Sequence, residues 1–149
     1  MAFGDQASSG SEPFRSAHCA DRLFVYGTLR RDANSPAHRW LAQRSEFLGG
    51  AWCHGRLYRI AHYPGLVPTD DPDERVVGEV YALQQLESTL AELDRYEECG
   101  PEFPEPTEYL RRQRRVAMAD GRELSAWVYI YNRRPPESAR IVSGDFLKP

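Results

Sequence analysis

Near its N-terminus the chain reads Leu23-Phe24-Val25-Tyr26-Gly27-Thr28-Leu29-Arg30. The first four residues of this stretch favour a β-strand, so the sequence predicts a strand that runs directly into a glycine-containing bend. Gly27 has no Cβ, which lets the backbone approach another group closely or adopt a conformation that other residues avoid. Backbone N–H groups at such a bend can point at a ligand, so this stretch is a candidate binding loop.

The size and charge of the chain narrow the class of its partner. With 149 residues, the chain is long enough to bury a core of its own without disulfides or a structural metal. Its formal net charge is −3 at pH 7, so it lacks the basic excess of general nucleic-acid or anionic-membrane binders. We therefore expect a small-molecule partner, no nucleic acid and no membrane. The oligomeric state stays open.

The first 20 residues differ in composition from the rest of the chain. They are small, polar and aperiodic and contain no apolar segment of the kind a signal peptide needs, which predicts a disordered tail over residues 1–20 and one domain over residues 21–149. The cysteines, which have no C-x-x-C spacing, argue against a disulfide framework and a zinc site: Cys19, Cys53 and Cys99. Together these features predict a cytoplasmic protein.

Two windows of the sequence predict helices. The first runs from about Ser35 to Arg44, with Ser35 as a possible N-cap and proline at the first helical position. The second runs from about Leu83 to Cys99, and its apolar stripe has helical spacing: Leu86, Leu90, Leu93 and Tyr96. Glu97 follows Leu93 by four residues, so its carboxylate is expected beside this stripe, either buried or lining a cavity.

The remaining apolar segments predict a mixed α+β fold. The expected strands are Leu23–Thr28, Ala51–Ile60, Val76–Leu83, Arg112–Ala119 and Leu124–Tyr131. Asp120-Gly121 between the last two is a strong hairpin signal. Many strands, short loops and only two helices predict a small mixed β-barrel with flanking helices.

Common catalytic motifs are absent from the chain, which contains no G-x-S-x-G elbow, no H-E-x-x-H and no Walker A loop. Cys53 and His54 are adjacent on a predicted strand and so should point to opposite faces, which argues against a Cys–His pair between them. Asp94 is expected to be a helix-surface charge and Asp145 a turn residue that caps local backbone. The arginines between positions 111 and 115 are interpreted as a solvated strand edge.

A set of short motifs carries a resemblance to a known family. They occur in the order Val25-Tyr26-Gly27-Thr28-Leu29-Arg30, Gly55-Arg56-Leu57-Tyr58, Tyr63-Pro64-Gly65-Leu66-Val67-Pro68, Gly78-Glu79-Val80-Tyr81, Leu93-Asp94-Arg95-Tyr96-Glu97, Tyr109-x-Arg111, Ala126-Trp127-Val128-Tyr129-x-Tyr131 and Ser143-Gly144-Asp145-Phe146. In this order and spacing they resemble the γ-glutamylcyclotransferase-like superfamily, in particular its AIG2-like and γ-glutamylamine cyclotransferase branch.

The resemblance implies a small mixed β-barrel with flanking helices and an enzyme that needs no cofactor and no metal. The family reaction cyclises a γ-glutamyl group to 5-oxoproline and releases an amine or amino acid. In the family, a Tyr-Gly-[Ser/Thr]-Leu loop holds the γ-glutamyl group and a glutamate acts as acid and base. Carried onto this chain, those positions are Tyr26, Gly27, Thr28, Leu29 and Glu97.

The chemistry of cyclisation agrees with this assignment. The α-amine of the substrate must lose a proton, the leaving nitrogen must gain one, and the oxyanion between these steps needs N–H donors. For Glu97 to serve near neutral pH, burial must raise the pKa of its carboxyl. The family usually has glycine after the catalytic glutamate, whereas Glu98 stands here and is a rival. Glu97 is preferred because it continues the apolar stripe, while Glu98 is rotated by about a hundred degrees on a helix.

Some assignments stay open at this level. Tyr109 and Tyr131 can line the substrate pocket or fill the core. A non-catalytic binding module with the same pocket is an alternative to the enzyme, because fold and pocket do not guarantee chemistry. A third alternative is a small β-barrel that binds single-stranded nucleic acid through aromatic residues and arginines.

Overall fold

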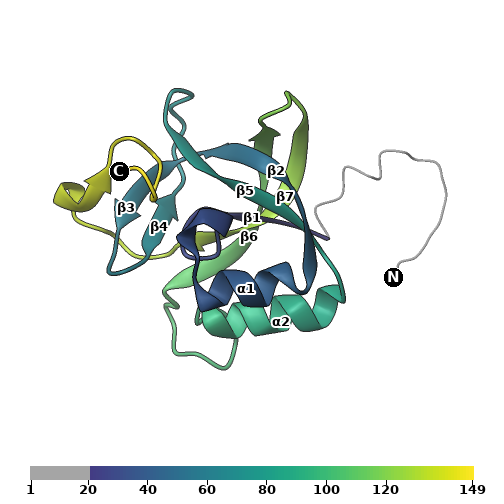
Figure 1. Cartoon of the computed structure of the whole chain (residues 1–149). Helices are drawn as coiled ribbons and strands as arrows, with labels where there is room; N and C mark the ends of the chain where they lie inside the picture. Colours follow the sequence, from purple (N-terminus) through teal and green to yellow (C-terminus); the bar gives the residue numbers. More distant parts are fainter. Residues whose placement is uncertain (1–20) are drawn as a thin grey trace.

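A closed β-barrel forms the centre of the computed structural model, which describes residues 21–149 (Figure 1). The tail predicted for residues 1–20 lies outside the described residues. Around the barrel the strands follow in the order β1 (Arg22–Val25), β5 (Arg75–Leu83), β2 (Ser45–His54), β6 (Tyr109–Met118) and β7 (Glu123–Tyr131). The ring closes where β1 pairs in parallel with β7, with Leu23 opposite Trp127.

A three-stranded extension continues from β7 to one side of the barrel, on the left in Figure 1. It consists of β4 (Pro64–Val67), β3 (Arg56–Arg59) and β8 (Arg140–Ile141). The link to the barrel is a parallel pairing in which Leu66 lies opposite Ile130. The predicted α+β class and small mixed β-barrel with flanking helices are confirmed.

Two α-helices pack on the outside of the barrel. Helix α1 (Pro36–Ala42) begins as predicted, because the Ser35 hydroxyl accepts a hydrogen bond from the His38 N–H at 3.0 Å. Helix α2 is Leu86–Tyr96. Short 3₁₀ turns occur at Arg31–Ala33 and Glu137–Ala139.

The core has two layers, and alternation along β1 supplies both. Phe24 points into the barrel interior, together with Val80 and Val128. Leu23 and Val25 point the other way and pack against the helices in a second cluster. That second cluster contains Leu41 of α1 and, from α2, Leu90 and Leu93. The candidate loop at residues 26–29 therefore follows a strand that is held on both faces.

The predicted stripe of α2 is correct in its centre and wrong at its end. Leu90 and Leu93 are buried, as expected, but Tyr96 is 54% exposed. Its hydroxyl reaches the Thr28 hydroxyl at 3.0 Å instead of entering the core.

The strand predictions need several corrections. The segment Ala51–Ile60 was expected to be one strand, but the chain turns at Gly55 and forms β2 and β3 on either side. A Cβ on Gly55 would lie 2.9 Å from Leu66 Cδ2, so the close approach of β4 requires glycine there. Strand β2 also begins earlier than predicted, at Ser45, and β4 and β8 were not predicted. The Asp120-Gly121 hairpin between β6 and β7 is confirmed, with Gly121 at φ +95.

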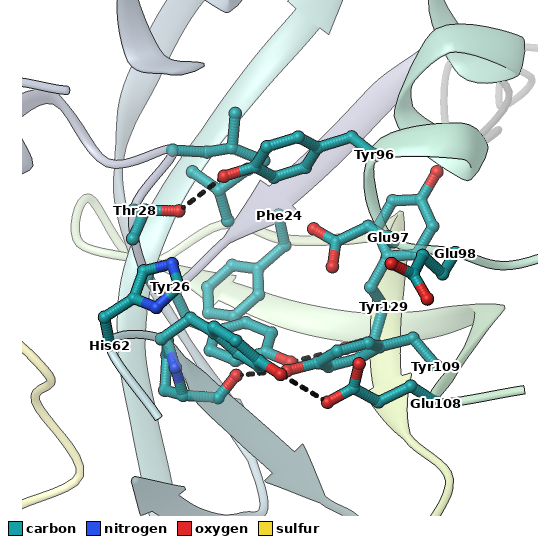
Figure 2. Close-up of a pocket in the computed structure, with 15 residues that line it drawn as sticks. Phe24, Tyr26, Thr28, His62, Tyr96, Glu97, Glu98, Glu108, Tyr109 and Tyr129 are labelled. Carbon is teal, nitrogen blue, oxygen red and sulfur yellow. Dashed lines mark hydrogen bonds between the residues drawn. The ribbon is translucent and has the colours of Figure 1, made fainter. Parts of the chain in front are cut away.

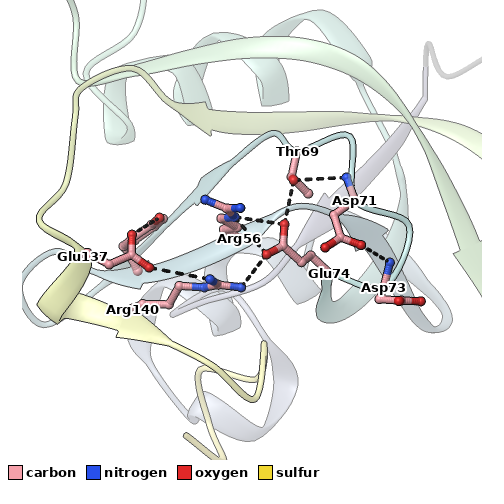
Figure 3. A network of polar contacts seen from close by, with 8 residues as sticks. Arg56, Thr69, Asp71, Asp73, Glu74, Glu137 and Arg140 are labelled. Carbon is pink, nitrogen blue, oxygen red and sulfur yellow. Dashed lines mark hydrogen bonds and ion pairs between the residues drawn. The ribbon is translucent and has the colours of Figure 1, made fainter.

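A network of polar side chains around Glu74 holds the three-stranded extension to the barrel (Figure 3). The Glu74 carboxylate accepts hydrogen bonds from Thr69 Oγ1 at 2.6 Å, Arg56 Nε at 2.9 Å and Arg140 Nη2 at 2.8 Å. The hydrogen bonds from Thr69 and Arg56 lower the pKa of Glu74 to about 2. Through Arg140 the network ties the loop before β5 to β8.

Candidate active site

A cavity of about 190 Å³ opens where β1 ends and the C-terminal end of α2 approaches it. Four segments and one single residue line it: residues 24–29, 62–64, 96–98 and 108–109, together with Tyr129. The structure thus brings Tyr26, Gly27, Thr28, Leu29, Glu97 and Tyr109 to one cavity, although they are spread over most of the chain (Figure 2).

The loop after β1 forms one wall as a tight turn. The Arg30 N–H donates to the Gly27 carbonyl at 3.0 Å, which closes the turn. Gly27 lies so close to the neighbouring segment that a Cβ would meet Pro64 Cδ at 2.6 Å. Among the described residues, none accepts a hydrogen bond from the N–H of Thr28 or Leu29. Both residues line the cavity, and their N–H groups are not occupied by an acceptor from the described chain.

Tyr26 forms part of the wall and is fixed by its hydroxyl. The hydroxyl donates to the Tyr129 carbonyl at 2.6 Å and accepts from the Leu66 N–H at 3.1 Å. Burial raises the pKa of Tyr26 well above its ordinary value, so the phenol stays protonated. With its hydroxyl engaged on both sides, Tyr26 offers its ring to the cavity and ties β1 to β4 and β7.

Glu97 stands across the cavity from this loop, at the end of α2. Its N–H donates to the Leu93 carbonyl at 2.9 Å, which continues the helical pattern for one residue. Figure 2 shows its carboxylate directed into the cavity, on the opposite side from Thr28. Burial, followed by the charges of Glu108 and Asp94, raises the pKa of Glu97 to about 8. The carboxyl can therefore exchange a proton near neutral pH.

Glu98, the rival carboxylate, also lines the cavity but in a different setting. Its backbone has φ 52, in the left-handed region where glycine is usual, so the departure from the family's Glu-Gly pattern is accommodated by backbone strain. Glu98 is exposed, whereas Glu97 is partly buried. The two neighbours thus differ in burial as their positions at the helix end predicted.

The sequence left open whether Tyr109 and Tyr131 line the pocket or fill the core, and the structure places the two residues differently. Tyr109 lines the cavity, and its hydroxyl donates to the Pro64 carbonyl at 2.6 Å. Tyr131 lies behind it, with the two rings edge to face and their centroids 5.4 Å apart. Tyr131 does not line the cavity, and its ring packs where a Cβ on Gly65 would be. Its position supports Tyr109 from behind.

The sequence interpretation of Asp94 was wrong. Its carboxylate accepts hydrogen bonds from Arg111 Nε at 2.8 Å and from the Tyr129 hydroxyl at 2.6 Å, so it is an inward-facing member of the site's surroundings. Its position three residues before Glu97 places both on one helix face, and that spacing was the signal. Arg111, expected on a solvated edge, pairs with Asp94 and lies over the Trp127 ring at 4.6 Å.

Other cavity residues lie on loops, and of these His62 and Glu108 stood in none of the sequence motifs. The Tyr63 hydroxyl donates to Glu108 Oε2 at 2.6 Å, and Figure 2 shows the Glu108 carboxylate next to Tyr109, with His62 on the opposite side of the cavity. Asp145 caps local backbone as predicted, accepting from the Leu147 N–H at 3.0 Å, and it also pairs with Arg30 at 2.8 Å.

Two other kinds of site were open from the sequence, a Cys–His pair and a metal site. Cys53 is 2% exposed and the neighbouring His54 is exposed, so the two residues face opposite ways as predicted. Within residues 21–149 no group of three or more histidine, cysteine, aspartate or glutamate side chains could hold a metal ion. In the same residues, no helix is both long and apolar enough to span a membrane.

Comparison with known proteins gives a family match over nearly the whole described chain. A family model described as "Gamma-glutamyl cyclotransferase, AIG2-like" matches residues 23–148. The Escherichia coli protein named "Gamma-glutamylcyclotransferase family protein YtfP" is 36% identical over 129 residues, which cover 85% of this chain and 96% of that protein.

Solved structures agree with this match. YkqA from Bacillus subtilis superposes with a TM-score of 0.64 at 29% identity, over 85% of this chain. This chain spans 39% of the YkqA chain. An AIG2-like protein from mouse superposes with a TM-score of 0.67 at 24% identity, over 85% of this chain and 87% of that one, and this likeness shows the fold alone.

Proposed function

Because the chain belongs to the gamma-glutamyl cyclotransferase, AIG2-like family, we propose that it is a γ-glutamyl cyclotransferase. It cyclises the γ-glutamyl group of a small γ-glutamyl amine or γ-glutamyl amino acid to 5-oxoproline and releases the free amine. One observation carries the proposal: Glu97, with its pKa raised to about 8, stands across a cavity of about 190 Å³ from the loop of Thr28 and Leu29.

In the first step, the α-amine of the substrate attacks its own γ-carbonyl carbon and a new C–N bond forms. Glu97 accepts the proton that the amine gives up. The carbonyl oxygen becomes an oxyanion, and the N–H groups of Thr28 and Leu29 are the donors that stabilise it. Removing one such donor typically costs roughly a hundredfold or more in rate.

In the second step, the tetrahedral intermediate collapses and the original γ-carbon to nitrogen bond breaks. The protonated Glu97 returns its proton to the leaving nitrogen, so the amine departs neutral and the carboxylate is restored. A group with a pKa near the working pH serves best in both directions. Because amine and carbonyl belong to one molecule, the cavity needs only to fold the substrate into a reactive shape.

The carboxylates that line the cavity can bind the substrate's ammonium group. Glu98 and Glu108 line the cavity with Glu97, and His62 is the basic side chain among the lining residues. Tyr63 fixes the Glu108 carboxylate by its 2.6 Å hydrogen bond. A carboxylate pair at this place favours a cationic group before Glu97 takes its proton.

The direct test is release of 5-oxoproline from a panel of γ-glutamyl amines and γ-glutamyl amino acids. The wild-type protein is expected to release 5-oxoproline and free amine in equal amounts from at least one member, and Glu97→Gln to slow the release by roughly a hundredfold or more. The matched control is Glu92→Gln, which removes an exposed carboxylate on the same helix that does not line the cavity, and it is expected to stay active. Binding of panel members without release would favour the non-catalytic module.

A further inference from the structure

The loop that carries the proposed oxyanion donors is held from outside the cavity by the first turn of α1. The Ser35 hydroxyl donates a hydrogen bond to the Thr28 carbonyl. The His38 Nδ1 lies 3.1 Å from the Leu29 carbonyl oxygen. A carbonyl only accepts, so this bond requires a proton on Nδ1. Neither Ser35 nor His38 lines the cavity, whereas Thr28 and Leu29 do, so both carbonyls are drawn away from it.

The direction of these carbonyls determines the direction of the N–H groups. In a planar trans peptide, the C=O of one residue and the N–H of the next point opposite ways. Because Ser35 draws the Thr28 carbonyl toward α1, the Leu29 N–H is turned to the opposite side, where the cavity lies. If this peptide group flipped, a carbonyl oxygen would replace the donor and repel an oxyanion.

His38 affects the orientation of the Thr28 N–H through the turn between Gly27 and Arg30. Its bond to the Leu29 carbonyl orients the next N–H, that of Arg30, toward the Gly27 carbonyl at 3.0 Å. The Gly27 carbonyl is thereby held within the turn, which directs the Thr28 N–H outward. The contacts of Ser35 and His38 thus act on both donor peptide groups of the loop.

The far end of the loop is fastened independently. The Arg31 N–H donates to Glu79 Oε1 at 2.8 Å, and the same oxygen accepts from the Tyr81 hydroxyl at 2.9 Å. Glu79 is 7% exposed, and Arg30, which pairs with Asp145, is 8% exposed. Because these contacts anchor the C-terminal end of the loop, the orientation of the peptide groups between residues 27 and 30 depends on which groups bind their carbonyls.

We propose that Ser35 and His38 are positioning residues for this reaction, which orient the Leu29 and Thr28 N–H groups toward the substrate's γ-carbonyl oxygen. This inference rests on the proposed function. It assigns to the start of α1 a role in catalysis, exercised through the loop and without contact with the substrate.

Ser35 also caps α1, so a variant must separate the two roles. Asparagine and aspartate both serve as N-caps, and they have nearly the same shape. Only asparagine carries an N–H that can donate to the Thr28 carbonyl, whereas the aspartate carboxylate can only accept. Ser35→Asn therefore keeps both contacts, and Ser35→Asp keeps the cap but loses the hydrogen bond to the loop.

His38 offers a second matched pair. It occupies the third position of α1, where a negative charge is favourable to the helix. His38→Asn places an N–H donor where Nδ1 lies, and His38→Asp places an acceptor there. The Asp variants at either position are therefore expected to fold, and a loss of activity in them would reflect the loop.

The experiment compares the four full-length variants with the wild type in kcat, KM and thermal midpoint, using the best substrate from the panel, and follows the Leu29 amide by NMR. Each Asp variant is expected to lose roughly a hundredfold in kcat, as for a lost oxyanion donor, while its KM changes by less than about threefold. The Asn variants are expected to stay within about threefold of wild type. The Leu29 amide signal should move in Ser35→Asp and stay in place in Ser35→Asn.

Equal kcat values for Ser35→Asp and Ser35→Asn, with the same Leu29 amide signal, would overturn the inference. If the wild type releases no 5-oxoproline at all, the proposed function fails, but the Leu29 amide still decides whether Ser35 orients the loop. If the Asp variant does not fold, Ser35→Thr against Ser35→Ala repeats the comparison. Threonine keeps the donating hydroxyl, so activity equal in both would also contradict a positioning role.

Discussion

Replacing Glu97 by glutamine is expected to inactivate the protein and to stabilise it. The folded state raises the pKa of this carboxyl from 4.5 to about 8. A carboxyl with a raised pKa resists ionisation in the folded state but ionises freely in the unfolded state. The wild type therefore loses stability relative to the neutral amide as pH rises from 4.5 to about 8.

The gain in stability at pH 7 is set by the interval between the unfolded-state pKa of Glu97, 4.5, and pH 7. One unit of pKa corresponds to about 1.4 kcal/mol, so Glu97→Gln is expected to gain at most roughly 3 kcal/mol in free energy of unfolding at pH 7. At pH 4 the two proteins should be nearly equal in stability. Loss of the acid and base should at the same time lower kcat/KM by roughly a hundredfold to ten-thousandfold.

Urea denaturation at pH 4, 7 and 9 measures the stability difference, and 5-oxoproline release measures the activity. Glu92→Gln is the matched control, because this exposed carboxylate on the same helix does not line the cavity and should show neither effect. The reasoning is refuted if Glu97→Gln keeps wild-type activity, or if its stability relative to wild type does not increase between pH 4 and pH 8.

Three further outcomes are expected. Glu108→Gln removes a charge that raises the pKa of Glu97, so the acidic limb of the kcat/KM profile should move from about 8 to lower pH in a rate measurement. Glu74→Gln should destabilise the fold at pH 7 in urea denaturation; since the folded-state pKa of Glu74 is lowered to about 2, the difference from wild type should shrink as pH falls from about 4.5 to 2. Gly27→Ala would place a Cβ 2.6 Å from Pro64 Cδ, so kcat/KM should fall by roughly ten- to a hundredfold, whereas unchanged kinetics would show that this contact is unimportant.

Local signals in the sequence predicted the elements that local interactions decide. Ser35 and the proline after it mark the start of α1, and Asp120-Gly121 marks the β6–β7 hairpin, because caps and tight turns depend on a few adjacent residues. Strand β4 was missed because its first two residues, Pro64 and Gly65, disfavour strands. Its pairing with β7 comes from tertiary contacts. The break at Gly55 likewise depends on the approach of a distant strand.

In the candidate site, too, local sequence patterns identified some residues, whereas others are placed by tertiary contacts. Helical spacing was enough to direct attention to Glu97, since Leu93 one turn earlier is buried. Asp94 could have been found by the same spacing, as it shares a face with Glu97. Glu108 could not, because it stands on a loop whose meeting with Tyr63 at the cavity depends on the fold of the whole barrel.

The most direct test of the account is the appearance of 5-oxoproline when the wild-type protein is incubated with the γ-glutamyl panel, with Glu97→Gln run in parallel. The account predicts stoichiometric release of 5-oxoproline and amine from at least one compound by the wild type, and release slower by roughly a hundredfold or more by Glu97→Gln. Absence of release from every compound, or equal release by the two proteins, would contradict it.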